Sequence, residues 1–202
     1  VRYSGAENQL LAFAEKYNIP IAETQAGKGI IPWQNPLNLG GIGVTGGKAA
    51  NVIGRDADLV IGVGTRFSDF TTSSKWLFNE NRKVLAINIC PFDAYKMDAE
   101  AVVADAREAL NALADALNGY KTKYTDEISK AKAEWDAIVD DYYTKELDGG
   151  LNQTLALGII NEFMGDEDIA LGSAGSLPGD MQRLFRPKGR GTYLSLIHIS
   201  EP

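Results

Sequence analysis

Short apolar runs alternate with amphipathic segments along residues 1–122. The runs at residues 59–63, 84–89 and 101–103 are apolar almost throughout, which is typical of strands that are buried on both faces of a sheet. A further short strand is expected at residues 19–22, next to Pro20. Because helical segments separate these strands, the pattern predicts an α/β fold: a doubly wound parallel sheet with helices on both faces.

The helices of this region carry start signals and apolar faces. The motif Ser4-x-x-Glu7 reads as a capping box, and Asp105-x-x-Glu108 is expected to cap a second helix. A third, short helix is expected at residues 48–53, after a glycine-rich loop at residues 27–47. The first two helices have apolar positions at helical spacing, namely Leu10, Phe13, Ala14 and Tyr17 in one and Leu110, Leu113, Ala114 and Leu117 in the other.

A long charged helix is expected at residues 124–146, and it should end at Gly149-Gly150. Because composition changes here, we interpret residues 123–150 as a helical linker between two domains. The buried stripe of the long helix is expected to comprise Ile128, Trp135, Ile138, Val139 and Tyr142.

A second unit follows the linker. It shows one helix at residues 154–163, a turn at Gly165-Asp166, one strand at residues 169–171 and a Gly/Ser loop. One helix and one strand cannot bury a sheet on both faces. We therefore expect residues 151–193 to be the truncated start of a second α/β domain.

Composition and charge limit the partners. Hydrophobic residues make up 45% of the 202 residues and the net charge is −7, which argues against a nucleic-acid or anionic-membrane partner because phosphate binding depends on Lys and Arg. No apolar run approaches the roughly 20 residues that span a bilayer, and residues 1–5 lack the features of a signal peptide. We expect a cytoplasmic protein, and the absence of Met at position 1 predicts a native N-terminus upstream.

The single cysteine and single histidine limit the chemistry. Cys90 alone excludes an internal disulfide and a cysteine cage for a metal, and its position after an apolar run predicts a buried residue at a strand end. With His198 the only histidine, the rest of the chain holds no Ser-His or Cys-His nucleophile system. The carboxylates lie mostly in helix caps and on charged faces, so we assign no catalytic and no metal-binding residue.

Three glycine-rich segments are candidates for ligand binding. Residues Gly41 to Gly46 satisfy G-x-G-x-x-G, but they follow no convincing strand, so a turn leading into a helix is favoured over a dinucleotide site. The segment from Gly62 to Asp69 begins at the carboxyl end of a strand; Arg66 and Asp69 could contact a ligand, pair with each other or hold the loop, and a structural role is favoured. Gly172 to Gly179 follows the second unit's strand, and there a phosphate site and a plain turn both remain open.

In this order, the segments resemble the thiamine-diphosphate enzymes of the acetolactate-synthase and pyruvate-decarboxylase type. Residues 27–32, 40–46 and 58–69 are similar to landmarks of that family's Rossmann-like middle domain, so the resemblance implies that residues 1–122 form this domain. Residues 172–187 resemble the hydrolases of bacterial myo-inositol catabolism that cleave a carbon–carbon bond of a cyclic dione and release 5-deoxy-glucuronate. The implied cofactors are thiamine diphosphate, which supplies the electron sink, and magnesium.

The resemblance also implies roles for particular residues. Gly175, Ser176 and Leu177 match the loop that contacts the cofactor diphosphate in relatives. The activating glutamate is expected upstream of Val1 and the magnesium-binding segment downstream of this chain, so the chain alone should be inactive. The full-length protein is expected to be a homo-oligomer, a dimer or a tetramer. Residues 64–69 match a loop that holds FAD in flavin-bearing relatives, and we expect it to be structural here.

Two alternatives and one anomaly remain. The chain could belong to an acetolactate-synthase-like or glyoxylate-carboligase-like enzyme with FAD in the middle domain. It could instead be a free-standing domain that binds NAD or another nucleotide, although no acidic ribose partner lies at the usual distance after a strand. Residues 194–202 depart from the family after Tyr193 and resemble translated sequencing-adapter sequence, so we expect this tail to be non-native.

Overall fold

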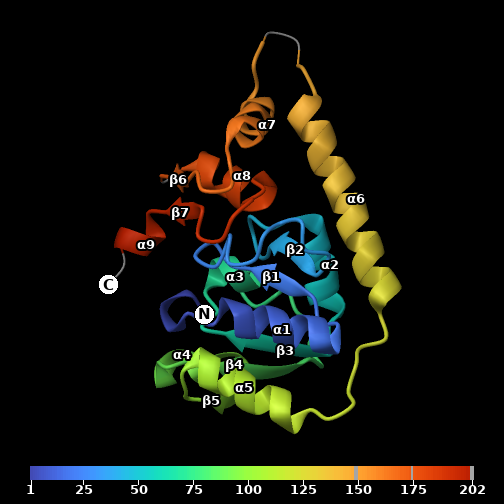
Figure 1. The fold of residues 1–202 in the computed structure, drawn as a ribbon, viewed down its shortest axis with the longest axis vertical. Coiled ribbons are helices and arrows are strands. Elements are labelled where there is room, and N and C mark those ends of the chain that lie inside the picture. The colour runs from blue at the N-terminus through green and yellow to red at the C-terminus, as the bar shows by residue number, and fades with distance from the viewer. Residues whose placement is uncertain (148–149, 174, 201–202) are drawn as a thin grey trace.

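The computed structural model describes residues 1–147, 150–173 and 175–200. Figure 1 labels the α-helices and strands. In chain order the elements are η1 (Arg2–Ser4), α1 (Glu7–Tyr17), β1 (Ile21–Glu23), β2 (Asn38–Gly41), α2 (Lys48–Asp56), β3 (Leu59–Val63), α3 (Asp69–Thr72), β4 (Lys83–Ile87), α4 (Pro91–Ala94), η2 (Lys96–Asp98), β5 (Glu100–Val102), α5 (Ala106–Ala116), α6 (Thr125–Thr144), α7 (Gln153–Phe163), β6 (Ala170–Gly172), α8 (Ser176–Leu184), β7 (Tyr193–Ser195) and α9 (Ile197–Ser200).

The named strands pair in parallel, as their apolar composition predicts. They form a β1–β2 pair, a sheet in the order β3–β4–β5 and a β6–β7 pair. The predicted α/β class is confirmed, although the strands of the first 122 residues form two hydrogen-bonded sheets. The strand β2 was not predicted, because Asn38-Leu39-Gly40-Gly41 lacks the β-branched and aromatic residues that are typical of strands.

Side chains of β3 alternate between two cores, and each core is covered by helices. Ile61 and Val63 pack against the core that α1 and α5 cover, which contains Phe13 and Leu110. Val60 packs against the other core, which includes buried residues of α2 and α6. Helices therefore lie on both sides of the strands, as predicted from the sequence (Figure 1).

The two predicted helix starts have different outcomes. Asp105 is the N-cap of α5, and its carboxylate accepts a hydrogen bond from the Arg107 backbone N–H at 2.8 Å. The Ser4 capping box is wrong: Ser4 ends a 3-10 turn, and its hydroxyl donates to the Val1 carbonyl at 3.0 Å. Gly5 has a left-handed backbone with φ 55, which turns the chain so that α1 begins only at Glu7.

The long helix α6 runs along one edge of the molecule and connects the first unit to the second (Figure 1). Ile128 and Val139 are buried, as predicted. The prediction for Tyr142 is wrong, since this residue is 41% exposed; the adjacent Tyr143 faces inward, because the apolar stripe continues from Val139 at a spacing of four. The helix ends at Thr144, and Gly149 of the expected stop signal lies outside the described residues.

The second unit contains more structure than the predicted helix and strand. The helix α8 was not predicted, because the segment from Gly172 to Gly179 was interpreted as a Gly/Ser loop. Pro178 lies in the first turn of α8, where proline is tolerated. The strand β7, which includes two residues of the expected tail, pairs with β6 through Leu171 and Leu194. The predicted turn at Gly165-Asp166 is confirmed: the Gly165 N–H donates to Asp168 Oδ2 at 2.7 Å.

Candidate functional site

A strand, a short loop and a helix N-terminus form the candidate site. The chain leaves β6 at Gly172, passes through a loop whose Ala174 lies outside the described residues, and enters α8 at Ser176. Gly175 is the N-cap residue with φ 113 and ψ −159, and no side chain caps this helix start. The first backbone N–H groups of α8 therefore lack an intrahelical acceptor, and the helix dipole favours an anion there.

The loop has room for a ligand at this helix start. A Cβ atom added at Gly175 would meet no atom within 4 Å, and Ser176 and Leu177 are both exposed. A glycine with open space beside a free helix N-terminus is a typical phosphate cradle. The three residues that the resemblance assigned to the cofactor diphosphate thus lie together at one exposed helix N-terminus, and their geometry fits that group.

The opposite end of α8 is fixed firmly against the first unit. Gln182 is buried, and its side-chain Nε2 donates to the Ile42 carbonyl at 3.1 Å. Its Oε1 accepts a hydrogen bond from the Thr45 hydroxyl. A Cβ at Gly41 would approach the Gln182 carbonyl to 2.7 Å, so only glycine permits this contact. The first unit thereby sets the position of α8.

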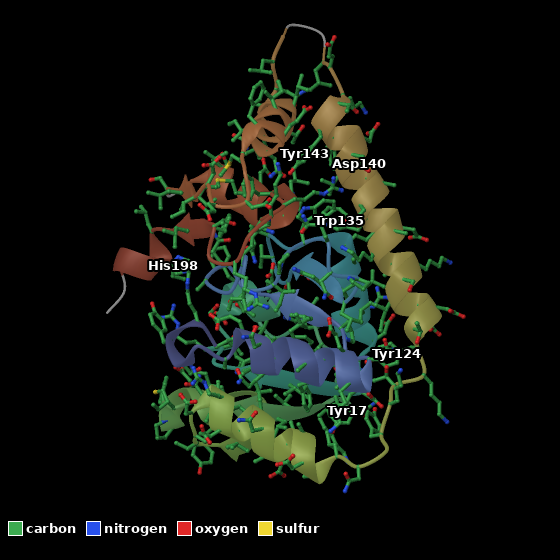
Figure 2. All side chains as sticks on the ribbon, viewed as in Figure 1. Tyr17, Tyr124, Trp135, Asp140, Tyr143 and His198 are labelled. Carbon is green, nitrogen blue, oxygen red and sulfur yellow. The ribbon has the colours of Figure 1, made fainter. Side chains whose placement is uncertain are left out.

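The G-x-G-x-x-G string is closed to ligands. Contrary to the sequence-based interpretation, it follows a true strand, β2, and precedes α2. However, α8 occupies the space beside Gly41, and a Cβ at Gly43 would meet the Phe70 carbonyl at 2.1 Å. The N-cap of α2, Gly47, lies under Trp135, whose ring would be 2.7 Å from a Cβ there; Figure 2 shows Trp135 on α6 facing the first unit. The favoured interpretation of a structural turn agrees with this packing.

The segment from Gly62 to Asp69 is stabilised by contacts with other residues of this chain. The Phe67 ring is buried at 6% exposure and fills the space beside Gly62, where a Cβ would lie 2.3 Å from the ring. Ser68 caps α3, and its side chain accepts from the Thr71 N–H. Arg66 and Asp69 are both exposed, and the Arg66 carbonyl accepts from Lys96 Nζ at 3.1 Å. These contacts suit the structural role expected for the loop.

Two single residues have different outcomes. Cys90 is exposed, so the prediction of a buried strand-end cysteine is wrong. The strand β4 ends three residues earlier, and the Cys90 N–H donates to Asn88 Oδ1 at 3.0 Å in a turn that leads into α4. His198 belongs to α9 and lies close to the first unit (Figure 2), where its Nε2 is 2.9 Å from the Ala26 carbonyl.

Two buried charged side chains were not expected from the sequence. Glu23 and Lys28 are 4% and 3% exposed. Burial raises the pKa of Glu23, opposed by the charge of Lys28 and by N–H donors from Gly29 and Ile31. Burial lowers the pKa of Lys28 to about 8, against the opposing charge of Glu23. A lysine in a glycine-rich loop gives no local sign of burial, because segments distant in sequence cover it.

Metal binding finds no support in the part of the chain that the structure covers. Within the described residues, no group of three or more His, Cys, Asp or Glu side chains could hold a metal ion. The only acidic side chain on α8 is Asp180, which pairs with Arg183 at 3.6 Å. Among the described helices, none is long and apolar enough to cross a membrane.

Comparison with known proteins identifies relatives. A family model described as "Thiamine pyrophosphate enzyme, central domain" matches residues 1–113. The 3D-(3,5/4)-trihydroxycyclohexane-1,2-dione hydrolases of Clostridium tetani and Geobacillus thermodenitrificans are each 48% identical, over 96% of this chain and 34% of their own length. The hydrolase of the same name from Clostridium perfringens is 47% identical over the same shares. The chain thus spans about a third of the length of these curated relatives.

Proposed function

This chain belongs to the thiamine pyrophosphate enzyme family, whose central domain it contains, and we propose that it works as part of a hydrolase acting on 3D-(3,5/4)-trihydroxycyclohexane-1,2-dione. The observation that carries the proposal is 48% identity to hydrolases of this name across 96% of the chain. The reaction proposed is cleavage of a ring carbon–carbon bond to give 5-deoxy-glucuronate, with magnesium as a second cofactor. When bound, thiamine diphosphate supplies the electron sink for that cleavage.

The N-terminus of α8 is the proposed diphosphate site. The N–H groups of its first turn would donate to phosphate oxygens, and Gly175 would let the phosphate approach the backbone. The hydroxyl of Ser176 would add a donor, and Leu177 would contribute its backbone N–H. The hydrogen bonds from Gln182 to the first unit would keep the helix start in place.

A division of the chain into four parts accompanies this proposal. Residues 1–122 would form the central domain, 123–150 the linker, 151–193 the start of the diphosphate-binding domain and 194–202 a non-native tail. The central-domain match at residues 1–113 supports the first part. Exposed apolar side chains support an incomplete second domain; they include Ile160, Phe163, Ile169 and Leu171.

The test of the proposed function is an assay of the full gene recovered from its source. With thiamine diphosphate and magnesium, we expect ring opening of the cyclic dione, and chelation of magnesium should abolish it. Activity on pyruvate together with a flavin absorbance band would instead assign the protein to the FAD-bearing relatives and overturn the proposal. The 202-residue chain alone should show no thermal shift with thiamine diphosphate, because most of the site is expected elsewhere.

The site assignment has its own test in the full-length enzyme. Ser176→Ala should raise the dissociation constant for thiamine diphosphate about tenfold, since a hydrogen bond to a charged group contributes about 1.5 kcal/mol or more. Ser129→Ala, which removes an exposed hydroxyl on α6, serves as the matched control and should leave the constant unchanged. Equal affinities of the two variants would remove Ser176 from the site.

A further inference from the structure

The G-x-G-x-x-G string of residues 41–46 is fixed in place by the first unit. Asn51 on α2 forms two hydrogen bonds with Gly43: its Oδ1 accepts from the Gly43 N–H at 2.9 Å, and its Nδ2 donates to the Gly43 carbonyl at 2.9 Å. The Gly47 N–H donates to the Gly41 carbonyl at 2.8 Å and closes the turn. A loop that is fixed on both sides can determine the position of an element that packs on it.

The element that packs on this loop is α8. The buried Gln182 carboxamide donates to the Ile42 carbonyl at 3.1 Å and accepts from the Thr45 hydroxyl. One turn earlier in α8, a Cβ at Gly179 would lie 3.1 Å from Thr45 Cγ2. Because the donor and the acceptor of a carboxamide are different atoms, both bonds form in only one register of the helix on the loop.

The register of α8 also sets the place of its first turn. Ser176, at the start of the helix, precedes Gln182 by six residues, which corresponds to roughly 9 Å along the helix axis. The N–H groups of the first turn can bind phosphate oxygens only at hydrogen-bonding distance, so a slide or rotation of the helix weakens those bonds. The contacts of Gln182 therefore control the geometry of a site that Gln182 does not touch.

We propose that residues 41–46 are the seat of α8, and that Gln182 and Thr45 are positioning residues for the cofactor diphosphate. In this role the glycine-rich string binds a helix of the second unit in place of a nucleotide. The proposal rests on the proposed function, because it needs thiamine diphosphate at the N-terminus of α8. It adds that the central domain sets the affinity for the cofactor through α8.

Calorimetric titration of the full-length apoenzyme with thiamine diphosphate and magnesium tests Gln182. Gln182→Met keeps a side chain of similar size without either hydrogen bond, and it should raise the dissociation constant about tenfold. The turnover number at saturating cofactor should stay unchanged. Asn88→Leu is the matched control: this buried amide donates to the Thr65 carbonyl at 3.0 Å and accepts from the Cys90 N–H at 3.0 Å, both within the first unit. Equal dissociation constants for Gln182→Met and Asn88→Leu would overturn the proposal.

A milder pair of variants tests the other partner of this contact. Thr45→Val removes the hydroxyl that donates to Gln182 and should weaken cofactor binding about fivefold, whereas Thr45→Ser keeps the hydroxyl and should bind like the unaltered enzyme. Adding Thr45→Val to Gln182→Met should cause little further loss, because both changes remove the same hydrogen bond. If Thr45→Val and Thr45→Ser bind the cofactor equally well, the hydroxyl has no positioning role.

Hydrogen exchange gives a readout that a purely structural role would not change. Because coupling between two sites is reciprocal, thiamine diphosphate should slow amide exchange of residues 41–47 in the unaltered full-length enzyme and in Asn88→Leu, and much less in Gln182→Met. The same slowing in all three proteins would overturn the proposal. An unaltered enzyme that binds no thiamine diphosphate would instead overturn the proposed function, so the two failures are distinguishable.

Discussion

At the scale of single residues, buried hydroxyl groups connect distant parts of the chain. Tyr17 donates to the Ala114 carbonyl at 2.6 Å and thereby connects α1 to α5. Tyr143 donates to the Leu184 carbonyl at 2.7 Å and to Asn161 Oδ1 at 3.0 Å, which connects α6 to α7 and α8. Burial raises the pKa of Tyr143 well above its ordinary value, as expected for a phenol enclosed by packed helices.

Removal of the Tyr143 hydroxyl should be costly. Tyr143→Phe should lower the free energy of unfolding by about 1 to 2 kcal/mol, because it leaves the buried Leu184 carbonyl without a donor. Tyr142→Phe is the matched control, since Tyr142 is adjacent on the same helix but 41% exposed, and it should change stability by less than about 0.5 kcal/mol. Urea denaturation measures both, and equal effects would contradict the inward orientation of Tyr143.

The buried lysine should make stability depend on pH. The folded-state pKa of Lys28 is about 8 and its ordinary value 10.5, so between these values the unfolded chain holds a proton that the folded chain has released. Because the unfolded state binds more protons in this window, the free energy of unfolding should rise with pH from about 8 to 10.5, in total by about 3 kcal/mol.

The measurement compares the unaltered chain with the Lys28→Met variant. Subtracting the denaturation profile of Lys28→Met from that of the unaltered chain isolates this residue from other groups that titrate at high pH, such as Tyr193, whose pKa burial raises to about 12. If the difference in the free energy of unfolding stays flat or falls with pH, the pKa of the Lys28 ammonium is not lowered in the folded chain.

At the scale of elements, the packing of α6 on α2 depends on the close approach of Trp135 to Gly47. Gly47, the N-cap of α2, has an ordinary negative φ of −84, so its importance is steric. A Cβ at this position would lie 2.7 Å from the indole of Trp135, well inside contact distance. The absence of a side chain is what lets the indole cover the start of α2.

An alanine at this contact should push the two helices apart. Gly47→Ala should lower the free energy of unfolding by about 1 to 3 kcal/mol through overpacking. Gly165→Ala is the control, because its Cβ would meet only Asp168 Oδ2 at an ordinary 3.6 Å. Denaturation followed by Trp fluorescence tests the pair; a neutral Gly47→Ala would mean that α6 can move away from α2 at little cost.

At the scale of the whole molecule, Arg186 joins three segments. Its guanidinium donates to Asp140 Oδ1 at 2.6 Å and to the Asp136 carbonyl at 2.9 Å, both on α6. It also lies 4.5 Å from the centroid of the Trp33 ring, which belongs to the first unit. The side chain of Arg186 is only 15% exposed, so these contacts operate largely away from water.

Loss of this arginine should loosen the second unit. Arg186→Met should lower the free energy of unfolding by about 2 kcal/mol, because a mostly buried cation with several partners is removed. It should also speed proteolysis of residues 151–193. Arg183→Met, near the end of α8, is the control: its side chain is 38% exposed and pairs with Asp180 at 3.6 Å, so a change below about 1 kcal/mol is expected. Identical proteolysis of the two variants would contradict the role of Arg186.

Much of the fold could be predicted because its signals are local. The apolar run at residues 59–63 coincides with β3, the Asp105 cap begins α5, and the helical spacing of Phe13, Ala14 and Tyr17 marks the buried face of α1. These features depend on alternation, helical period and capping, which involve neighbours within a few residues. The order of the glycine-rich segments was likewise sufficient to indicate the family, which the central-domain match confirms.

Only the tertiary structure decided which residues of the glycine-rich segments and strand ends are buried and which are exposed to solvent. Gln182 occupies the space beside Gly41, although the two residues lie 141 positions apart in the sequence. The side chain of Gln182 also donates a hydrogen bond to the carbonyl of the neighbouring Ile42. Lys28 is buried against Tyr193 by the same long-range packing, and Cys90 is exposed because β4 ends early. Periodicity reports which face of an element is apolar, but burial is set by what packs against that face, and that information lies elsewhere in the chain.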